Sequence, residues 1–129
     1  TRMPIVGFVV EDETIFGALN GCIVGWALLA LAPRWGHTQG VVLAIVACYS
    51  ALYIFTLAGA VVAGLPPGAG FSTLAEVHSL FSAKEAVLAG WTHYIAFDLF
   101  VGRFIVADSQ FVGIPHLLIA LLMYIWGQP

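Results

Sequence analysis

Three charge-bearing side chains lie within one apolar stretch of this sequence, between Ala86 and Ile105. His93 and Asp98 lie near its middle, and Arg103 lies near its end. An ionisable side chain in hydrocarbon costs roughly 2.5–3.5 kcal/mol on insertion scales, so its presence there points to a function. The imidazole could act as a base or bind a metal. The carboxyl group, kept protonated by desolvation, could donate a proton.

On a helix, the residues of this stretch separate onto two faces. One face carries an acid, a phenol, an indole and a glycine gap, all within about 80° of one another: Asp98, Tyr94, Trp91 and Gly102. The other face, about 140° from the acid, carries an imidazole in an aromatic wall: His93, Phe97, Phe100 and Phe104. His93 and Asp98 therefore cannot pair directly on a regular helix, and each needs a partner from another helix or from a ligand.

The composition sets the environment of these residues. The chain has 129 residues, of which 61% are hydrophobic and only 9% are charged, whereas roughly 25% of residues are charged in soluble proteins. We therefore expect an integral membrane protein whose partner is the lipid bilayer. The net charge is −3 and no basic run is present, which excludes nucleic-acid binding. The chain starts at Thr1 without a signal-peptide pattern, and we expect a processed or truncated product.

Four apolar stretches predict an all-α membrane protein with four transmembrane helices, forming a single membrane domain over residues 1–129. We expect the spans at residues 14–32, 40–64, 84–107 and 113–127, with Asp108 and Ser109 ending the third span. Between the second and third spans, the pairs Thr73–Glu76 and Ser82–Glu85 match the capping box that opens a helix. The first pair predicts a short amphipathic surface helix at residues 73–82, and the second opens the third span.

Two spacing patterns predict how the first two spans pack. Gly17, Gly21 and Gly25 repeat every four residues, which lets a neighbouring helix approach closely in lipid. The second span has a mildly polar and aromatic face that we expect to point inward, made of Tyr49, Tyr53, Thr56 and Ala60.

The start of the fourth span adds one more candidate. Pro115 suits the first helical turn, and His116 then lies at the helix N-terminus, where the dipole disfavours the imidazolium. A neutral His116 could act as base, hydrogen-bond donor or metal ligand. With four alternating spans, several charged and polar residues gather at one membrane face: Arg34, His37, Arg103, Asp108 and His116.

The last third of the chain resembles a known family. The motifs are Leu80-Phe81-Ser82, the run Ala86–Trp91, His93-Tyr94, the run Ala96–Arg103, Asp108 and Ile114-Pro115-His116. They are similar to the core of the small four-helix membrane proteins named after the plant abscisic-acid-deficient locus needed for neoxanthin formation, a family with bacterial and algal relatives. The resemblance implies a plastid thylakoid or envelope membrane, or a bacterial one, and a link to xanthophylls. In plants the family is required for converting violaxanthin to neoxanthin.

One hypothesis is therefore a carotenoid epoxide isomerase. Opening an epoxide to an allenic alcohol needs a proton donor at the epoxide oxygen and a base for a ring-adjacent proton. Asp98 could be the donor and His93 or His116 the base, and Tyr94 completes the catalytic candidates. This isomerisation needs no redox cofactor.

A second hypothesis is a non-catalytic, chlorophyll- or carotenoid-binding small subunit of a photosystem–antenna complex, with other membrane subunits as partners. His93 could bind the magnesium of a chlorophyll, with Phe97 and Phe100 packed on the ring and Trp91 and Arg103 as further pigment contacts.

Two further interpretations have less support. Haem binding by His93 and His116 fits poorly, because one lies at mid-membrane and the other at an interface. Asp98 could instead fix the register of neighbouring helices, as polar residues in membrane bundles often do.

Overall fold

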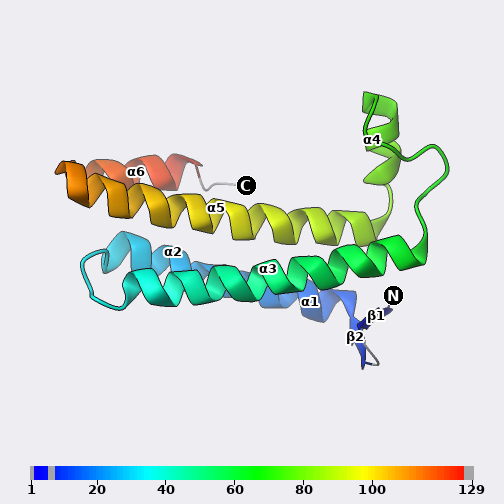
Figure 1. Cartoon of the computed structure of the whole chain (residues 1–129), viewed down its shortest axis with the longest axis horizontal. Helices are drawn as coiled ribbons and strands as arrows, with labels where there is room; N and C mark the ends of the chain where they lie inside the picture. Colours follow the sequence, from blue (N-terminus) through cyan, green and yellow to red (C-terminus); the bar gives the residue numbers. More distant parts are fainter. Residues whose placement is uncertain (1, 6–7, 127–129) are drawn as a thin grey trace. The chain divides into compact units, whose positions relative to one another are not determined.

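The computed structural model describes residues 2–5 and 8–126. The chain forms two compact units, the first made of Thr1–Leu19 with Tyr49–Tyr94 and the second of Asn20–Cys48 with Ile95–Pro129. Their elements follow in this order (Figure 1): β1 Arg2–Ile5, β2 Phe8–Glu11, α1 Asp12–Ala18, the 3-10 turn η1 Leu19–Gly21, α2 Cys22–Leu31, α3 Thr38–Ala63, α4 Leu74–Leu80, α5 Lys84–Val112 and α6 His116–Trp126.

The N-terminal hairpin is the exception to the all-α expectation. Strands β1 and β2 pair antiparallel, with Arg2 opposite Glu11 and Ile5 opposite Phe8. β2 contains two adjacent valines and a phenylalanine, residue types that favour extended backbone. The hairpin ends where α1 begins, with Asp12 and Glu13 in the first helical turn, where the positive end of the helix dipole favours acids.

A helix lies at each of the four stretches where the sequence predicts a span. Two helical segments, Asp12–Leu31 and Thr38–Ala63, are long and apolar enough to cross a membrane by length and composition. α5 has 29 residues but carries ionisable side chains, and α6 has 11 residues in its described part. Residue 127, where we expected the last span to end, lies outside the described residues. The four-span topology therefore stays a prediction.

The prediction that α5 ends at Asp108 and Ser109 is wrong. The helix continues to Val112, and within it the Ser109 hydroxyl donates to the Val106 carbonyl at 2.9 Å instead of capping a helix end. The turn comes at Gly113, whose φ of +81° lies in the left-handed region that favours glycine.

Of the two predicted capping boxes, the first is formed on its hydroxyl side, while the Glu76 carboxylate accepts from the Ser72 amide at 2.9 Å instead of from the amide of Thr73. At the start of α4, the Thr73 hydroxyl accepts a hydrogen bond from the Glu76 amide at 3.2 Å. The second box is not formed, because α5 begins at Lys84, one residue too late for Ser82 to be its N-cap. Ser82 instead donates its hydroxyl to the Ser79 carbonyl at 2.7 Å.

The inward face that we predicted for α3 is confirmed in the first unit. Tyr49, Thr56 and Ala60 are buried. The Tyr49 hydroxyl lies 3.0 Å from the Ala18 carbonyl oxygen and 3.2 Å from that of Leu19. These two carbonyls lie at the junction of α1 and η1, so the phenol satisfies acceptors at the irregular point of the first helical segment.

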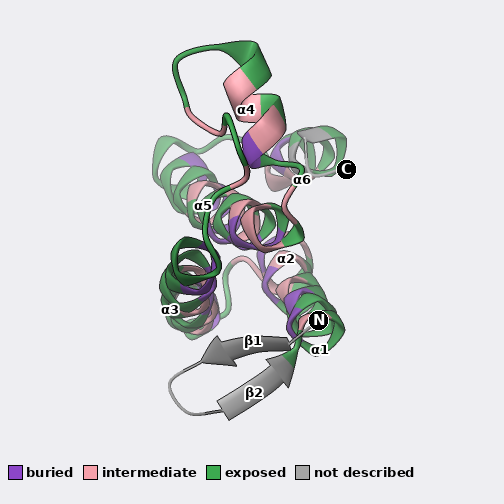
Figure 2. Ribbon diagram, turned by 90° about the vertical axis from the view of Figure 1, so that its right-hand side faces the viewer, coloured by how far each residue is buried: buried purple, intermediate pink, exposed green. Residues whose placement is uncertain are grey.

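The second unit has a close-packed apolar core, built from α2, α3, α5 and α6: Leu29, Val42, Val46, Leu99, Val106 and Ile119. In the end-on view of Figure 2, buried residues occupy only part of the circumference of each helix. A Cβ on Gly25 would come within 2.8 Å of Leu99, and one on Gly102 within 2.7 Å of Trp26. The predicted close approach thus occurs at Gly25, whereas a Cβ on Gly17 would meet nothing within 4 Å.

Candidate functional site

The first unit contains an apolar cavity of about 410 Å³. Three parts of the chain line it: the second half of α3 with Leu65 just beyond its end, the segment around α4, and the first turns of α5. In that order the lining residues are Tyr53, Leu57, Ala60, Val61 and Leu65; Phe71, Leu80 and Phe81; Ala86, Ala89, Gly90 and His93. This volume lies at the lower end of the roughly 300–1,000 Å³ of small-molecule sites.

Two rings supply the polar side-chain groups of this lining. The imidazole of His93 and the phenol of Tyr53 lie with their centroids 4.9 Å apart and their planes tilted by 52°. An imidazole can take or give a proton or bind a metal, and a phenol can donate a hydrogen bond. Few, convergent polar groups in an otherwise apolar lining are typical of ligand sites.

One wall of the cavity is formed by α4 (Figure 1) and the residues next to it, with Phe71, Leu80 and Phe81 in the lining. Its own hydrogen bonds fix it: the Ser79 hydroxyl donates to the Pro67 carbonyl at 2.8 Å, and the Phe81 amide donates to the Val77 carbonyl at 3.0 Å. The sequence predicts a helix here, but it does not show that the helix forms part of a cavity wall.

The other predicted residues of the first unit are not among those that line the cavity. The rings of Trp91 and Tyr94 pack on each other, with centroids 5.6 Å apart and planes tilted by 35°. This pair confirms that the two aromatic residues share a face of α5. Tyr94 remains a predicted catalytic residue, and Trp91 a predicted pigment contact.

The remaining predicted residues of α5 lie in the second unit. Asp98 is half-buried, whereas Phe97 and Phe100 are 58% and 44% exposed. Arg103 donates from Nε to the backbone carbonyl of Gln39 at 3.0 Å, and so ties α5 to the start of α3. This bond gives the arginine a structural use besides the predicted pigment contact.

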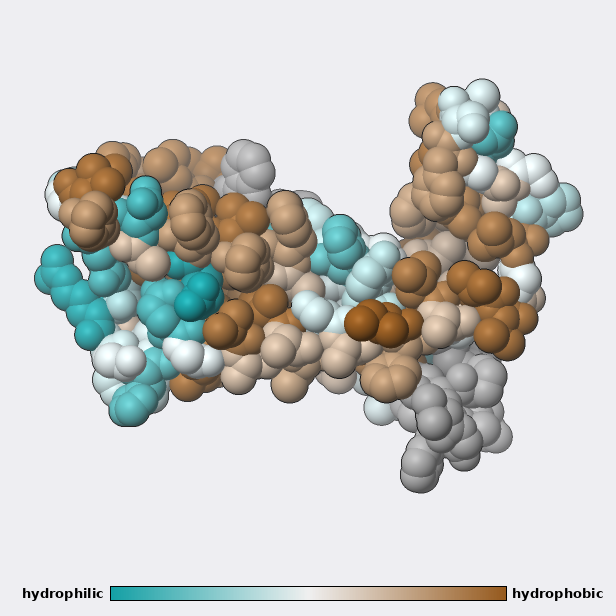
Figure 3. Space-filling view, viewed as in Figure 1, coloured by the Kyte–Doolittle hydropathy of each residue, from teal (hydrophilic) through white to brown (hydrophobic). Residues whose placement is uncertain are grey.

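His116 also has a backbone partner in the second unit. Its Nε2 lies 2.8 Å from the Ala30 carbonyl oxygen and donates to it, since a carbonyl can only accept. Gln110 makes the equivalent contact with the Pro33 carbonyl at 2.9 Å. These bonds hold the ends of α5 and α6 against the connection between α2 and α3, and Figure 3 shows hydrophilic surface gathered at this end of the unit.

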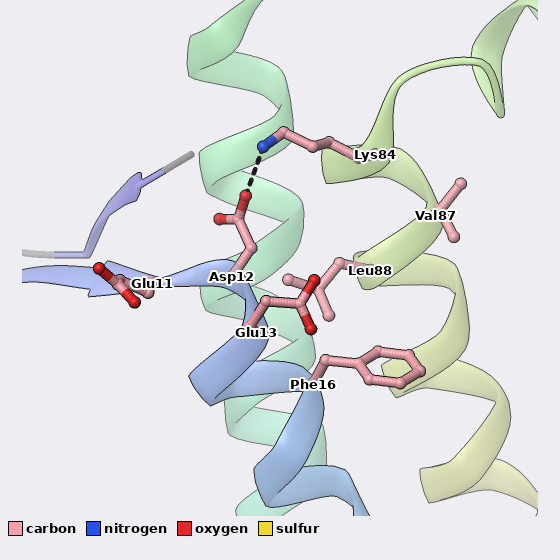
Figure 4. Close-up of a pocket in the computed structure, with 7 residues that line it drawn as sticks. All are labelled: Glu11, Asp12, Glu13, Phe16, Lys84, Val87 and Leu88. Carbon is pink, nitrogen blue, oxygen red and sulfur yellow. Dashed lines mark hydrogen bonds and ion pairs between the residues drawn. The ribbon is translucent and has the colours of Figure 1, made fainter.

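A second, more polar cavity of about 390 Å³ lies in the first unit, between α1 and the start of α5 (Figure 4). The Lys84 ammonium and the Asp12 carboxylate form an ion pair at 2.6 Å within it. Glu11 and Glu13 complete its charged lining. The Lys84 ammonium is already paired with the Asp12 carboxylate, so this contact joins α1 to α5. The lysine is therefore not available to bind an anion.

In the part of the chain that the structure describes, these features define a mainly helical protein with long apolar helices and an apolar cavity in its first unit. Residues 14–126 match the family described as ABA DEFICIENT 4-like. The chain belongs to this family, as the motifs of the third span indicate. Family and apolar helices together support a membrane protein. Membership links the chain, in general terms, to carotenoid and xanthophyll metabolism. Neither a curated protein nor a solved structure matches the chain significantly.

Proposed function

We propose that this protein crosses a plastid membrane, of the thylakoid or the envelope, with four helices and isomerises an epoxidised xanthophyll. The reaction is of the violaxanthin-to-neoxanthin type, in which an epoxide opens to an allenic alcohol. The observation that carries the proposal is the apolar cavity of the first unit, which holds one imidazole and one phenol, His93 and Tyr53.

The chemistry of the substrate suits such a cavity. A xanthophyll end group is an apolar ring with a few oxygen atoms, so it requires apolar walls and a small number of hydrogen-bonding groups. Apolar walls also exclude water, which would otherwise compete with the allene-forming step by adding to the opened epoxide. The first unit supplies both the walls and the polar groups.

In the proposed reaction, His93 takes the proton from the polyene carbon next to the epoxide-bearing ring carbon. The electrons of that C–H bond form the second double bond of the allene, and the bond from the ring carbon to the epoxide oxygen breaks. The oxygen stays on the neighbouring ring carbon and takes a proton to become a hydroxyl group. No atom is gained or lost, so the step is an isomerisation without an oxidant or a reductant.

Within the cavity lining, the Tyr53 hydroxyl is the group suited to donate a hydrogen bond to the epoxide oxygen. Asp98, His116 and Tyr94 stay predicted catalytic residues from the sequence. If Asp98 is the proton donor, Asp98→Asn abolishes product formation while the melting temperature stays within a few degrees of wild type. If the Asp98 side chain only fixes helix register, the same change lowers the melting temperature and leaves turnover per folded molecule intact.

A second candidate function is a pigment-binding small subunit of a photosystem–antenna complex. It is favoured by the many large apolar side chains that are exposed along α5 and α6, including Phe104, Phe111 and Leu117, because such a surface packs against pigments or partner helices. In this function the imidazole of His93, which is also exposed, binds the magnesium of a chlorophyll. Among the described residues no group of three or more His, Cys, Asp or Glu could hold a metal ion, but a chlorophyll magnesium needs only one protein ligand.

The deciding experiment is purification in a mild detergent, followed by an absorption spectrum, pigment extraction and incubation with violaxanthin. Conversion of violaxanthin to an allenic product, lost in His93→Gln, supports the isomerase. Stoichiometric chlorophyll that is lost in His93→Ala, without conversion, supports the pigment subunit and contradicts the isomerase. A colourless protein that neither binds nor changes violaxanthin contradicts both.

A further inference from the structure

We infer that Phe81, packed against Gly90, sets the size of the cavity in the first unit, so that it accepts one cyclised end group of an isoprenoid while the rest of the ligand stays outside. This inference rests on the proposed function and names the part of the ligand that the site recognises. It makes Phe81 and Gly90 specificity-determining residues, neither of which donates or takes a proton.

The first step of the argument is the contact between the two residues. A Cβ built on Gly90 would lie 2.9 Å from Cε1 and 3.4 Å from Cζ of Phe81. Real Cβ atoms are hardly ever that close to another heavy atom, so Phe81 lies where it does only because residue 90 has no side chain. Both residues line the cavity, so the position of the Phe81 ring against Gly90 fixes one of its walls.

The second step concerns which atoms can move when residue 90 gains a methyl group. The backbone of Phe81 is held by the bond from its amide to the Val77 carbonyl, and the following residue is held by the bond from the Ser82 hydroxyl to the Ser79 carbonyl. A methyl group at residue 90 would therefore be accommodated by movement of the phenyl ring rather than of the chain. Because the contact involves the far end of that side chain, the change alters the cavity more than it alters the stability.

The third step concerns size. A xanthophyll is about as long as the hydrocarbon core of a bilayer is thick, roughly 30 Å, so a whole molecule does not fit within a cavity of about 410 Å³. A single end ring does fit. The polar groups agree with this assignment, because His93 and Tyr53 lie in the same lining, and the oxygen atoms of a xanthophyll are carried by its end groups.

The test uses two probes of identical formula, β-ionone, which contains the cyclised end ring, and its acyclic isomer pseudoionone. Binding of each is measured in detergent to wild type, to Gly90→Ala and to the double variant Gly90→Ala with Phe81→Leu. Gly17→Ala is the matched control, since it adds the same methyl group to a helical glycine of the same unit where nothing lies within 4 Å. Melting temperatures of all variants are recorded alongside.

We expect wild type to prefer β-ionone and Gly90→Ala to lose about tenfold in its affinity, as is typical when one methyl group overfills a packed site. Pseudoionone, which is flexible, should lose much less, and Phe81→Leu should restore most of the preference. Equal loss for both isomers, or no loss for either, overturns the inference. So does wild type that binds violaxanthin but neither isomer. If the ring preference is present but violaxanthin is neither bound nor changed, the proposed function fails and the ring-sized cavity stands.

Discussion

The two units place the same kind of side chain in contrasting surroundings. In the second unit, the imidazole of His116 donates to a backbone carbonyl, that of Ala30. In the first unit, the imidazole of His93 lines an apolar cavity beside the phenol of Tyr53. Both histidines are candidates by residue type and motif. What separates them is the lining: the imidazole of His93 borders space that a ligand can occupy, whereas His116 is not among the residues that line this cavity.

The sharpest test of this contrast is His93→Gln, which keeps a polar side chain but removes the base. Loss of a general base typically lowers a rate by 10²–10⁴, so we expect conversion of violaxanthin to fall at least about 100-fold. The melting temperature should change little. Product formation per hour, separated by chromatography, measures the effect. His37→Gln is the matched control, because His37 is exposed in the connection between α2 and α3. Unchanged turnover in His93→Gln would show that the imidazole is not the base.

The opposite behaviour is expected of His116→Ala. It leaves the part-buried Ala30 carbonyl without its donor, which should lower the free energy of unfolding by about 1–3 kcal/mol. Binding of the ring probe to the remaining folded protein should stay as in wild type. Unfolding in mixed detergent measures the loss, and His116→Gln, which keeps a donor, should recover part of it. A stable His116→Ala protein that no longer converts violaxanthin would reverse our assignment of the two histidines.

The smallest effect is expected of Tyr53→Phe, which keeps the ring of the cavity lining and removes only the hydroxyl. The loss of one hydrogen bond to the epoxide oxygen should slow conversion by about tenfold or less. Preference for β-ionone over its acyclic isomer should remain, since the walls are unchanged. Parallel measurement of rate and of ring preference separates the two roles, and a loss of the preference would indicate that the hydroxyl helps to shape the cavity.

The positions of the helices are largely predictable from the sequence, because long apolar runs separated by Pro- and Gly-containing segments leave few alternatives. α3 ends at Ala63, one residue before the predicted end at Gly64, whose φ is +89°. α5 does not end where expected. Asp108 and Ser109 are residue types that often end helices, but the Ser109 hydroxyl bonds to the Val106 carbonyl in the preceding turn and the helix continues to Val112. The residue in the sequence that does mark this end is Gly113, whose left-handed φ of +81° terminates the helix.

The candidate site was predictable only in part, for a related reason. Periodicity orders residues around one helix, and it identified His93 on α5 and placed Tyr53 on the inward face of α3. It does not say which faces of two helices meet, so the ring contact between these residues required the structure. The contribution of Phe81 was equally hidden, because Gly90 gives no sign in the sequence that an aromatic ring is packed against it.

The end of α2 has a consequence for how the protein fits its membrane. The last carbonyls of a membrane helix normally need water or headgroups, which keeps helix ends at the bilayer surface. Here the carbonyls of Ala30, Ala32 and Pro33 accept hydrogen bonds from His116, Thr38 and Gln110. With donors supplied by the protein's own side chains, the end of α2 depends less on water or headgroups to satisfy its last carbonyls. This end of the second unit should therefore keep its hydrogen bonds whether water, headgroups or hydrocarbon surround it.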